Sequence, residues 1–237
     1  IYKSLFFLHM AITSQQMKEL EDYAEKKGIS KFELMENSGK AVFELISKEH
    51  DFLGKHIIIF AGHGNNGGDG FVIARYFAEF CNVLVLFFGK EEKLKDEARK
   101  NYLKIKDNVT IFEVETSNDL KCFKLQNNID YIFIDALLGT GIKIELREPL
   151  LFGINYFNEC EAYLKVAIDV PSGVNPDTGE SGSDKEGQIH ECNVDLIVTF
   201  HNIKLGLEKR GDLKEQVRVV DIGIPVEKPI SELRIKV

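Results

Sequence analysis

Short apolar runs alternate with longer amphipathic stretches along this chain. The runs are rich in Val, Ile and Phe and carry few polar residues, which is typical of strands buried on both faces of a parallel sheet. Seven strands are predicted in this way, over residues 56–61, 83–88, 109–114, 131–135, 166–169, 196–200 and 217–221. Because helical or irregular segments separate them, we expect an α/β fold, a Rossmann-like three-layer αβα sandwich around a mostly parallel, doubly wound sheet.

Two helices are predicted ahead of the first strand. Each begins with the capping-box spacing, in which paired side chains satisfy free backbone amides at a helix start. The pairs are Thr13 with Gln16 and Ser30 with Glu33. The first helix should end at about Lys27, before Gly28, and the second near His50. Further helices are expected over 92–104 and 149–161.

Length and composition describe an ordinary globular protein. At 237 residues the chain can bury one full core, and we expect a single domain over 13–237 behind an N-terminal extension or leader remnant over 1–12. Hydrophobic residues make up 44% and charged residues 29%, with no apolar run long enough to span a membrane. A net charge of -8 disfavours DNA or RNA as a partner, because phosphate backbones are bound by clustered Lys and Arg.

The cysteines bear on metal chemistry and on the cellular compartment. Cys81, Cys122, Cys160 and Cys192 lie tens of residues apart, with no C-x-x-C pair and no histidine at ligand spacing. This pattern favours neither a zinc site nor a disulfide framework. It is typical of a reducing compartment, so we expect an intracellular protein of the cytoplasm or of an organelle such as the mitochondrion.

A glycine-rich turn over 62–70 follows the first predicted strand and precedes a helical pattern. The glycines at G-x-G-x-x-G spacing are Gly62, Gly64 and Gly67. This spacing lets backbone amides approach a phosphate at a helix N-terminus. Asn65, Asn66 and Asp69 depart from the ordinary dinucleotide pattern, since a carboxylate repels phosphate but can cap a helix or accept hydrogen bonds from a sugar. The alternative is a tight turn with a good N-cap.

Polar side chains also end two later strands. Asp135 closes the strand 131–135, and Asp169 closes the strand 166–169, with Ser172 shortly after it. Ligands of doubly wound sheets bind beyond the carboxyl ends of the strands, so we expect these three residues and Asn66 to converge at one rim. Two carboxylates so close would repel unless a cation or a shared proton lay between them. The alternative is that both aspartates merely cap the loops that follow.

Five sequence blocks in order resemble the NAD(P)H-hydrate epimerases, the YjeF N-terminal domain family. They are LMENSG at 34–39, NNGGDG at 65–70, DALLGTG at 135–141, DVPSG at 169–173 and TFHNIK at 199–204. The resemblance covers about residues 13 to 225. It implies an isomerase that interconverts the R and S forms of hydrated NADH and NADPH, which carry a hydroxyl on C6 of the nicotinamide ring. A separate dehydratase then restores the cofactor from the S form.

The resemblance also implies a set of site residues. Substrate binding would fall on Asn65, Asn66, Gly67, Gly68, Asp69, Gly139, Thr140, Gly141, Ile142, Lys143, Ile144, Glu145 and Asp169. One potassium ion per subunit would be held by Asn66, Asp135 and Ser172. Asp169 would face the reacting ring, and the chemistry of that substrate suggests the hypothesis that it is the catalytic residue, which protonates the departing hydroxyl or activates the returning water. Members of the family commonly form homodimers through their N-terminal helices, so a homodimer is expected here.

Lys204 follows the strand 196–200, where it would reach a phosphate or remain an exposed loop lysine.

Three rival functions are weighed against the epimerase. One is a scaffold of the same fold that has lost the chemistry. A second is a dehydrogenase, but its acidic ribose ligand is missing where the strand 83–88 ends in Gly89 and Lys90. A third is a secreted binding protein, against which the scattered cysteines argue.

Overall fold

The structure is a computed structural model that describes residues 10–121, 123–141 and 145–225. Seven parallel strands form one sheet in the order β3-β2-β1-β4-β5-β8-β9. They are β1 (His56–Gly62), β2 (Val83–Phe88), β3 (Thr110–Glu113), β4 (Tyr131–Ala136), β5 (Leu164–Ile168), β8 (Leu196–Phe200) and β9 (Val217–Val220). The order reverses between β1 and β4, which confirms the predicted doubly wound sheet.

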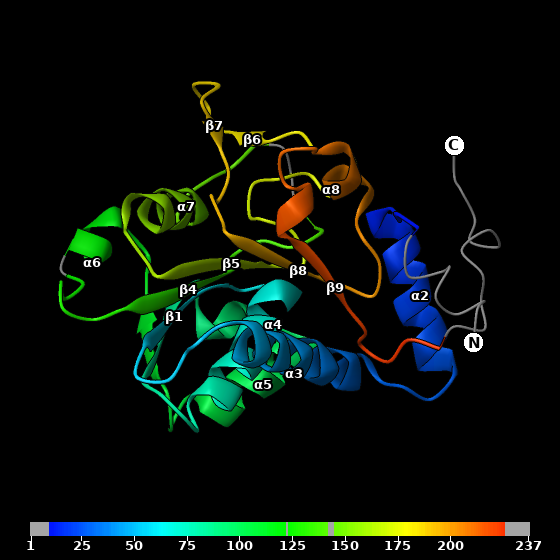
Figure 1. Cartoon of the computed structure of the whole chain (residues 1–237), viewed down its shortest axis with the longest axis horizontal. Coiled ribbons are helices and arrows are strands. Elements are labelled where there is room, and N and C mark those ends of the chain that lie inside the picture. Colours follow the sequence, from blue (N-terminus) through cyan, green and yellow to red (C-terminus); the bar gives the residue numbers. More distant parts are fainter. Residues whose placement is uncertain (1–9, 122, 142–144, 226–237) are drawn as a thin grey trace.

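Helices cover both faces of the sheet (Figure 1). On one face lie α3 (Lys31–Glu49), α4 (Asn65–Phe77) and α5 (Asp96–Ile105), and on the other lies α7 (Leu150–Glu159). The shorter or peripheral elements are α2 (Ser14–Lys26), η1 (Glu91–Lys93), α6 (Ser117–Lys121), β6 (Gly182–Ser183), β7 (Ile189–His190), α8 (Leu205–Lys209) and η2 (Lys214–Gln216). Among the described residues, no helix has the length and apolar character needed to cross a membrane.

Strand residues alternate between two hydrophobic cores. In β1, Ile57, Ile59 and Ala61 belong to the larger core with residues of α3, α4 and α5, whereas Ile58 and Phe60 belong to the core that contains α7. All five side chains are at most 2% exposed. Since both faces of the strand are buried, polar groups that serve a ligand are left to the strand ends and loops.

The N-terminal helices begin and end close to the predicted residues. The capping box of Thr13 and Gln16 is complete, with both side chains accepting from backbone amides. Ser30 accepts from the backbone amide of Glu33 as predicted, although only this half of the second box forms. Gly28, just beyond the end of α2, has a φ of 94°, which explains why a glycine ends this helix.

Contacts from the segment before α2 fix that helix beside the carboxyl ends of β5 and β8. Ile12 is fully buried and forms a parallel bridge to Lys204, and its amide donates to the carbonyl of Ile203 at 2.9 Å. The amide and hydroxyl of Ser14 both donate to the carboxylate of Asp177. One side of α2 therefore faces the strand ends.

The predicted helix over 92–104 is interrupted. It is divided into η1 and α5, with Leu94 and Lys95 in extended conformation between them. Leu94 is 2% exposed and packs into the larger core. An apolar side chain that must turn into the core breaks the helical path, so α5 begins only at Asp96.

Close packing at the glycine-rich turn generates a stability prediction. A Cβ on Gly67 would lie 1.8 Å from the carbonyl oxygen of Gly62, whereas a Cβ on Gly64 would meet nothing within 4 Å. We expect Gly67→Ala to lower the free energy of unfolding by about 3 kcal/mol, at the upper end for overpacking. Gly64→Ala is the matched control and should cost about 1 kcal/mol or less, as an altered N-cap. Urea unfolding followed by circular dichroism measures both variants, and equal losses would contradict the close approach.

Candidate active site

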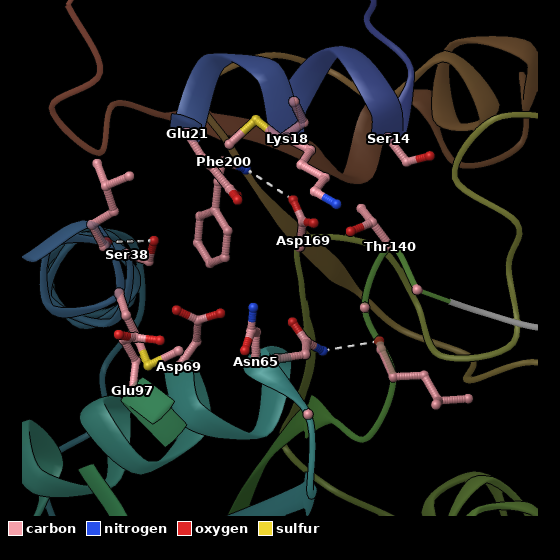
Figure 2. A pocket seen from close by; sticks show the side chains of 18 of the residues that line it. Ser14, Lys18, Glu21, Ser38, Asn65, Asp69, Glu97, Thr140, Asp169 and Phe200 are labelled. Carbon is pink, nitrogen blue, oxygen red and sulfur yellow. Dashed lines mark hydrogen bonds between the residues drawn. The ribbon is translucent and has the colours of Figure 1, made fainter. Parts of the chain in front are cut away.

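A pocket of about 590 Å³ opens at the carboxyl ends of β1, β4 and β5 (Figure 2). Residues of α2 and α3 line one side of it, and the first turn of α4 and the loop after β4 line the other. This is the switch point at which doubly wound sheets bind their ligands. The volume lies in the range of small-molecule sites.

The glycine-rich turn delivers polar side chains to this pocket. Asn65 and Asn66 occupy the first turn of α4 and line the pocket, and Asn66 Nδ2 donates to the carbonyl of Leu138 at 2.9 Å. The N-cap of α4 is Gly64, and no side chain caps the helix. The alternative of a turn built around a good N-cap is therefore wrong, because no side chain of the turn caps the helix and Asn66 bonds to Leu138 instead.

Asp169 is held by a buried ion pair that no sequence pattern predicts. Lys204 Nζ lies 2.6 Å from Asp169 Oδ1, and Lys204 is fully buried. The same ammonium donates to Thr199 Oγ1 and to the carbonyls of Phe200 and Asn202, at 3.0 to 3.3 Å. Both expectations for Lys204, a phosphate contact or an exposed position, are wrong, because its ammonium group is buried and pairs with Asp169.

The geometry of Asp169 leaves one carboxylate oxygen for the pocket. Oδ1 accepts from Lys204 and, at 3.3 Å, from the Thr199 hydroxyl and the Phe200 amide. Oδ2 accepts no hydrogen bond from the described residues. Asp169 has a φ of 65°, in the left-handed region that Asp tolerates better than most residues. This turn at the end of β5 aims the carboxyl group into the pocket (Figure 2).

A second polar group lies behind the pocket wall. Ser172 donates to the Asp135 carboxylate from its amide at 2.7 Å and from Oγ at 2.6 Å. The amide of Leu138 donates to Ser172 Oγ, and Asn66 Nδ2 donates to the carbonyl of the same Leu138. Burial raises the pKa of Asp135, and the hydrogen bonds from Ser172 oppose that rise. Leu138 thus joins the three predicted ion ligands into one hydrogen-bonded group.

The structure divides the polar residues expected at one rim. Asp135 and Ser172 are fully buried behind the wall, while Asn66 and Asp169 line the pocket itself. Asp169 needs no shared cation because Lys204 neutralises it. The expectation that the two aspartates repel each other is corrected accordingly, since each has its own set of partners.

Two more carboxyl groups face the same pocket. Figure 2 shows Asp69 pointing into it from α4 and Glu21 from α2. Burial, followed by the negative charges of Asp169 and Glu21, raises the pKa of Asp69 well above its usual range, against the opposing charge of Lys204. Burial and Asp169 likewise raise the pKa of Glu21. Of Asp69, Glu21 and Asp169, only Asp169 is therefore neutralised by a cation in contact with it.

Glu21 is the pocket residue that sequence reasoning missed. It follows Met17 by four positions and precedes Ala24 by three, so it lies on the stripe of α2 that carries the buried residues Met17, Leu20 and Ala24. A carboxyl group on a buried stripe is unfavourable unless it faces a polar space. A carboxylate among the buried positions of an amphipathic helix was thus the sequence signal from which Glu21 could have been predicted to face a polar site.

The remaining predicted substrate residues take several positions. The loop residues 139–141 line the pocket, and Gly67 and Gly68 are buried in α4 beneath it. Glu145 is exposed, pairs with Arg147 and is not among the lining residues. The others, Ile142, Lys143 and Ile144, lie outside the described residues.

Comparison with known proteins places this geometry in a family. A family model described as YjeF-related protein N-terminus matches residues 31–206. The chain belongs to this family. The matched segment holds the glycine-rich turn, both aspartates that end strands, and Lys204.

Named relatives of the family agree with this placement. The NAD(P)H-hydrate epimerase of Nitrosopumilus maritimus is 38% identical over 223 residues, covering 92% of this chain and 97% of the relative. The bifunctional NAD(P)H-hydrate repair enzyme Nnr of Archaeoglobus fulgidus is 40% identical, but the match covers 90% of this chain and only 42% of that protein. The crystal structure of yeast ynu0, YNL200c, has a TM-score of 0.72 at 22% identity, covering 90% of this chain and 88% of the other, and supports the fold alone.

The buried ion pair predicts a strong energetic coupling. We expect Lys204→Met to lower the free energy of unfolding by about 3–5 kcal/mol, because it leaves the Asp169 carboxylate buried without a cation. Adding Asp169→Asn to that variant should recover much of the loss, since the pair is then neutral. Lys40→Met, at an exposed position, is the control and should change stability by about 0.5 kcal/mol or less. Urea unfolding of the wild type, the two single variants and the double variant measures the coupling free energy between the two side chains. If the losses of the single variants simply add up in the double variant, the two side chains are not coupled.

Proposed function

We propose that the chain is an NAD(P)H-hydrate epimerase, which interconverts the R and S forms of hydrated NADH and NADPH. The observation that carries the proposal is the free oxygen of Asp169, which Lys204 holds at a pocket in the dinucleotide position of the fold. Relatives that carry this name match over nearly their whole length. A scaffold that had lost the chemistry would have no reason to keep a costly buried charge pair at a pocket wall.

The chemistry follows from the substrate. C6 of the hydrated ring bears a hydroxyl beside the ring nitrogen, so loss of the protonated hydroxyl as water leaves an iminium cation. Water that adds to the other face, and loses a proton, gives the opposite epimer. Asp169 Oδ2 gives or takes the proton at the C6 oxygen, a role typically worth about 10²–10⁴ in rate. Its charge also stabilises the cation.

Other features of the pocket suit the rest of a dinucleotide. The first turn of α4 has backbone amides without helical partners and the positive end of the helix dipole, which together favour a phosphate near Asn65. Lys18 of α2 lines the pocket and forms no ion pair within the described part of the chain. Phe200, 5% exposed, offers an apolar ring at the wall beside Asp169. The phosphate and the nicotinamide ring of the substrate would thus contact different parts of the pocket.

The polar group behind the wall fits a potassium ion. Asp135 supplies a fully buried carboxylate that has no cationic partner in the described ranges, and Asn66 and Ser172 add amide and hydroxyl oxygens. Oxygen donors alone suit a hard cation, and within residues 10–121, 123–141 and 145–225 no three His, Cys, Asp or Glu gather as a metal site. We assign one K⁺ per subunit to these three residues. When bound, it would neutralise Asp135 and steady the loop at 137–141.

Cofactor repair needs a dehydratase that acts on the S form. The bifunctional repair enzymes among the relatives match this chain over 42% and 40% of their own length. We propose a functional link between this chain and a dehydratase activity of that kind. The homodimer expected from the family remains a prediction, and size-exclusion chromatography with light scattering would test it.

Epimerase activity and the role of Asp169 can be measured together. The purified protein should convert the R epimer of hydrated NADH to the S epimer faster than the uncatalysed rate, as followed by chromatography. Asp169→Asn keeps the shape of the side chain and should reduce kcat by about 10²–10⁴ while substrate binding persists. Asp107→Asn, at an exposed position, is the control. Full activity of Asp169→Asn would remove this residue from the mechanism, and no acceleration by the wild type would favour the scaffold.

Potassium dependence is a separate prediction. Replacing K⁺ by Na⁺ at constant ionic strength should lower the epimerisation rate by roughly fivefold or more, as typical for an effector coupled to a site. Ser172→Ala removes one oxygen and should raise the K⁺ concentration needed for half activation. Equal rates in the two salts, for the wild type and this variant alike, would contradict the ion site.

A further inference from the structure

Four carboxyl groups line the pocket, and two of them, Asp169 and Glu97, have a cationic partner. Asp169 is paired with Lys204. Asp69 and Glu21 form no hydrogen bond or ion pair within the part of the chain that the structure describes. Asp69 is nevertheless 8% exposed, so its carboxyl group is nearly buried and aimed into the pocket without a partner. A buried polar group in this state points to a ligand or to chemistry.

Asp69 and Asp169 enter the pocket from opposite walls. In Figure 2, Asp169 comes from the end of β5 above the open space and Asp69 comes from α4 below it. The two groups are electrostatically close, because Asp169 is the strongest of the charges that raise the pKa of Asp69. A flat ring bound between these walls would present one face to each carboxyl group.

Inversion at C6 requires chemistry on both faces of that ring. Water leaves from one face, and water returns to the other. A carboxyl group on one wall reaches the oxygen on its own face only. Asp169 alone therefore accounts for one of the two proton transfers, and the second needs a group on the opposite wall.

We propose that Asp69 is the second catalytic acid–base group, acting on the ring face opposite to Asp169. The inference rests on the epimerase function proposed above. For the epimer whose hydroxyl faces Asp69, its carboxyl proton passes to that hydroxyl, and the C6–O bond breaks to give water and the iminium cation. Water on the other face forms the new C6–O bond, and its proton passes to Asp169 Oδ2. The reverse reaction exchanges these two roles. After a forward turnover, exchange with solvent water takes the proton from Asp169 and restores one to Asp69, so atoms and electrons balance with water alone.

The protonation states suit these roles. Lys204 beside Asp169 favours a carboxylate there, ready to accept a proton. Asp69 has no cation in contact, and burial raises its pKa well above the usual range, so it can donate. A pair of carboxyl groups whose environments separate their protonation in this way is the pattern of an acid and a base. Glu21 enters from α2, on the same side of the view as Asp169, whereas Glu97 lies on the side of Asp69. Glu97 pairs with Lys100, so Asp69 is the carboxyl group of that side without a cationic partner.

The direction of the pH dependence follows from the raised pKa. The titratable and charged groups around the pocket besides Asp69 are Lys18, Glu21, Lys31, His63, Glu97, Asp169 and Lys204. Asp69 holds its proton below its raised pKa and loses it as pH rises through that value. The kcat/KM of the wild type should therefore fall at alkaline pH.

Asp69→Asn tests the assignment. The variant should bind hydrated NADPH, as measured by calorimetry, yet lose about 10²–10⁴ in kcat in both directions. Its residual activity should lack the alkaline fall of the wild type. Glu21→Gln should keep that alkaline fall, and Glu79→Gln, exposed just beyond α4, should match the wild type throughout.

The outcomes separate this inference from the function on which it rests. If the wild type does not accelerate epimerisation, the proposed function fails before any variant is compared. If the wild type is active and Asp69→Asn keeps its kcat and its alkaline fall, the role of Asp69 is overturned while the function stands. Should Asp69→Asn fail to fold, the wild-type profile decides, because a kcat/KM that does not fall at alkaline pH excludes a neutral carboxyl donor.

Discussion

The ion pair between Asp169 and Lys204 joins the parts of this protein on which its pocket depends. Lys204 is fully buried, so its charge is tolerable only because a carboxylate and three oxygen acceptors surround it. Those partners lie at the ends of β5 and β8. The backbone of Lys204 also bridges Ile12 in the segment before α2. One residue thus connects the Asp169 carboxylate, through its side chain, to the segment before α2, through its backbone.

The carboxyl groups around the pocket lie in different electrostatic environments, which can give them different protonation states. One carboxylate is compensated by a buried cation, a second is enclosed with neutral donors behind the wall, and a third faces the ligand without a partner. Each environment favours a different protonation state or ligand. A fold with several aspartates at its strand ends can therefore give each one a separate task through local burial and hydrogen bonding.

Much of the fold could be predicted from the sequence because its signals are local. Mostly apolar runs mark β1, β4 and β8, and Thr13 and Gly28 mark the limits of α2. Two-residue strands such as β6 and β7 are too short to give a pattern, and the turn of Leu94 into the core overrides helix propensity in its segment.

The site was harder to predict than the fold. The motif blocks supplied Asn66, Asp69 and Asp169, since each lies in a short recognisable segment. The partner of Asp169 could not be found in this way, because Lys204 lies 35 positions later and meets it only through two irregular loops. Glu21 gave only an indirect signal, as a carboxylate on a buried stripe.

The burial of Lys204 also affects how such a protein can change over generations. A chain that lost Asp169 alone would retain an ammonium in its interior with only neutral oxygens around it, and a chain that lost Lys204 alone would retain the unpaired carboxylate. Either single step harms the fold as well as the chemistry. Descendants of this protein that abandon the reaction are therefore expected to replace both residues together, so the two positions should change as a pair and seldom one at a time.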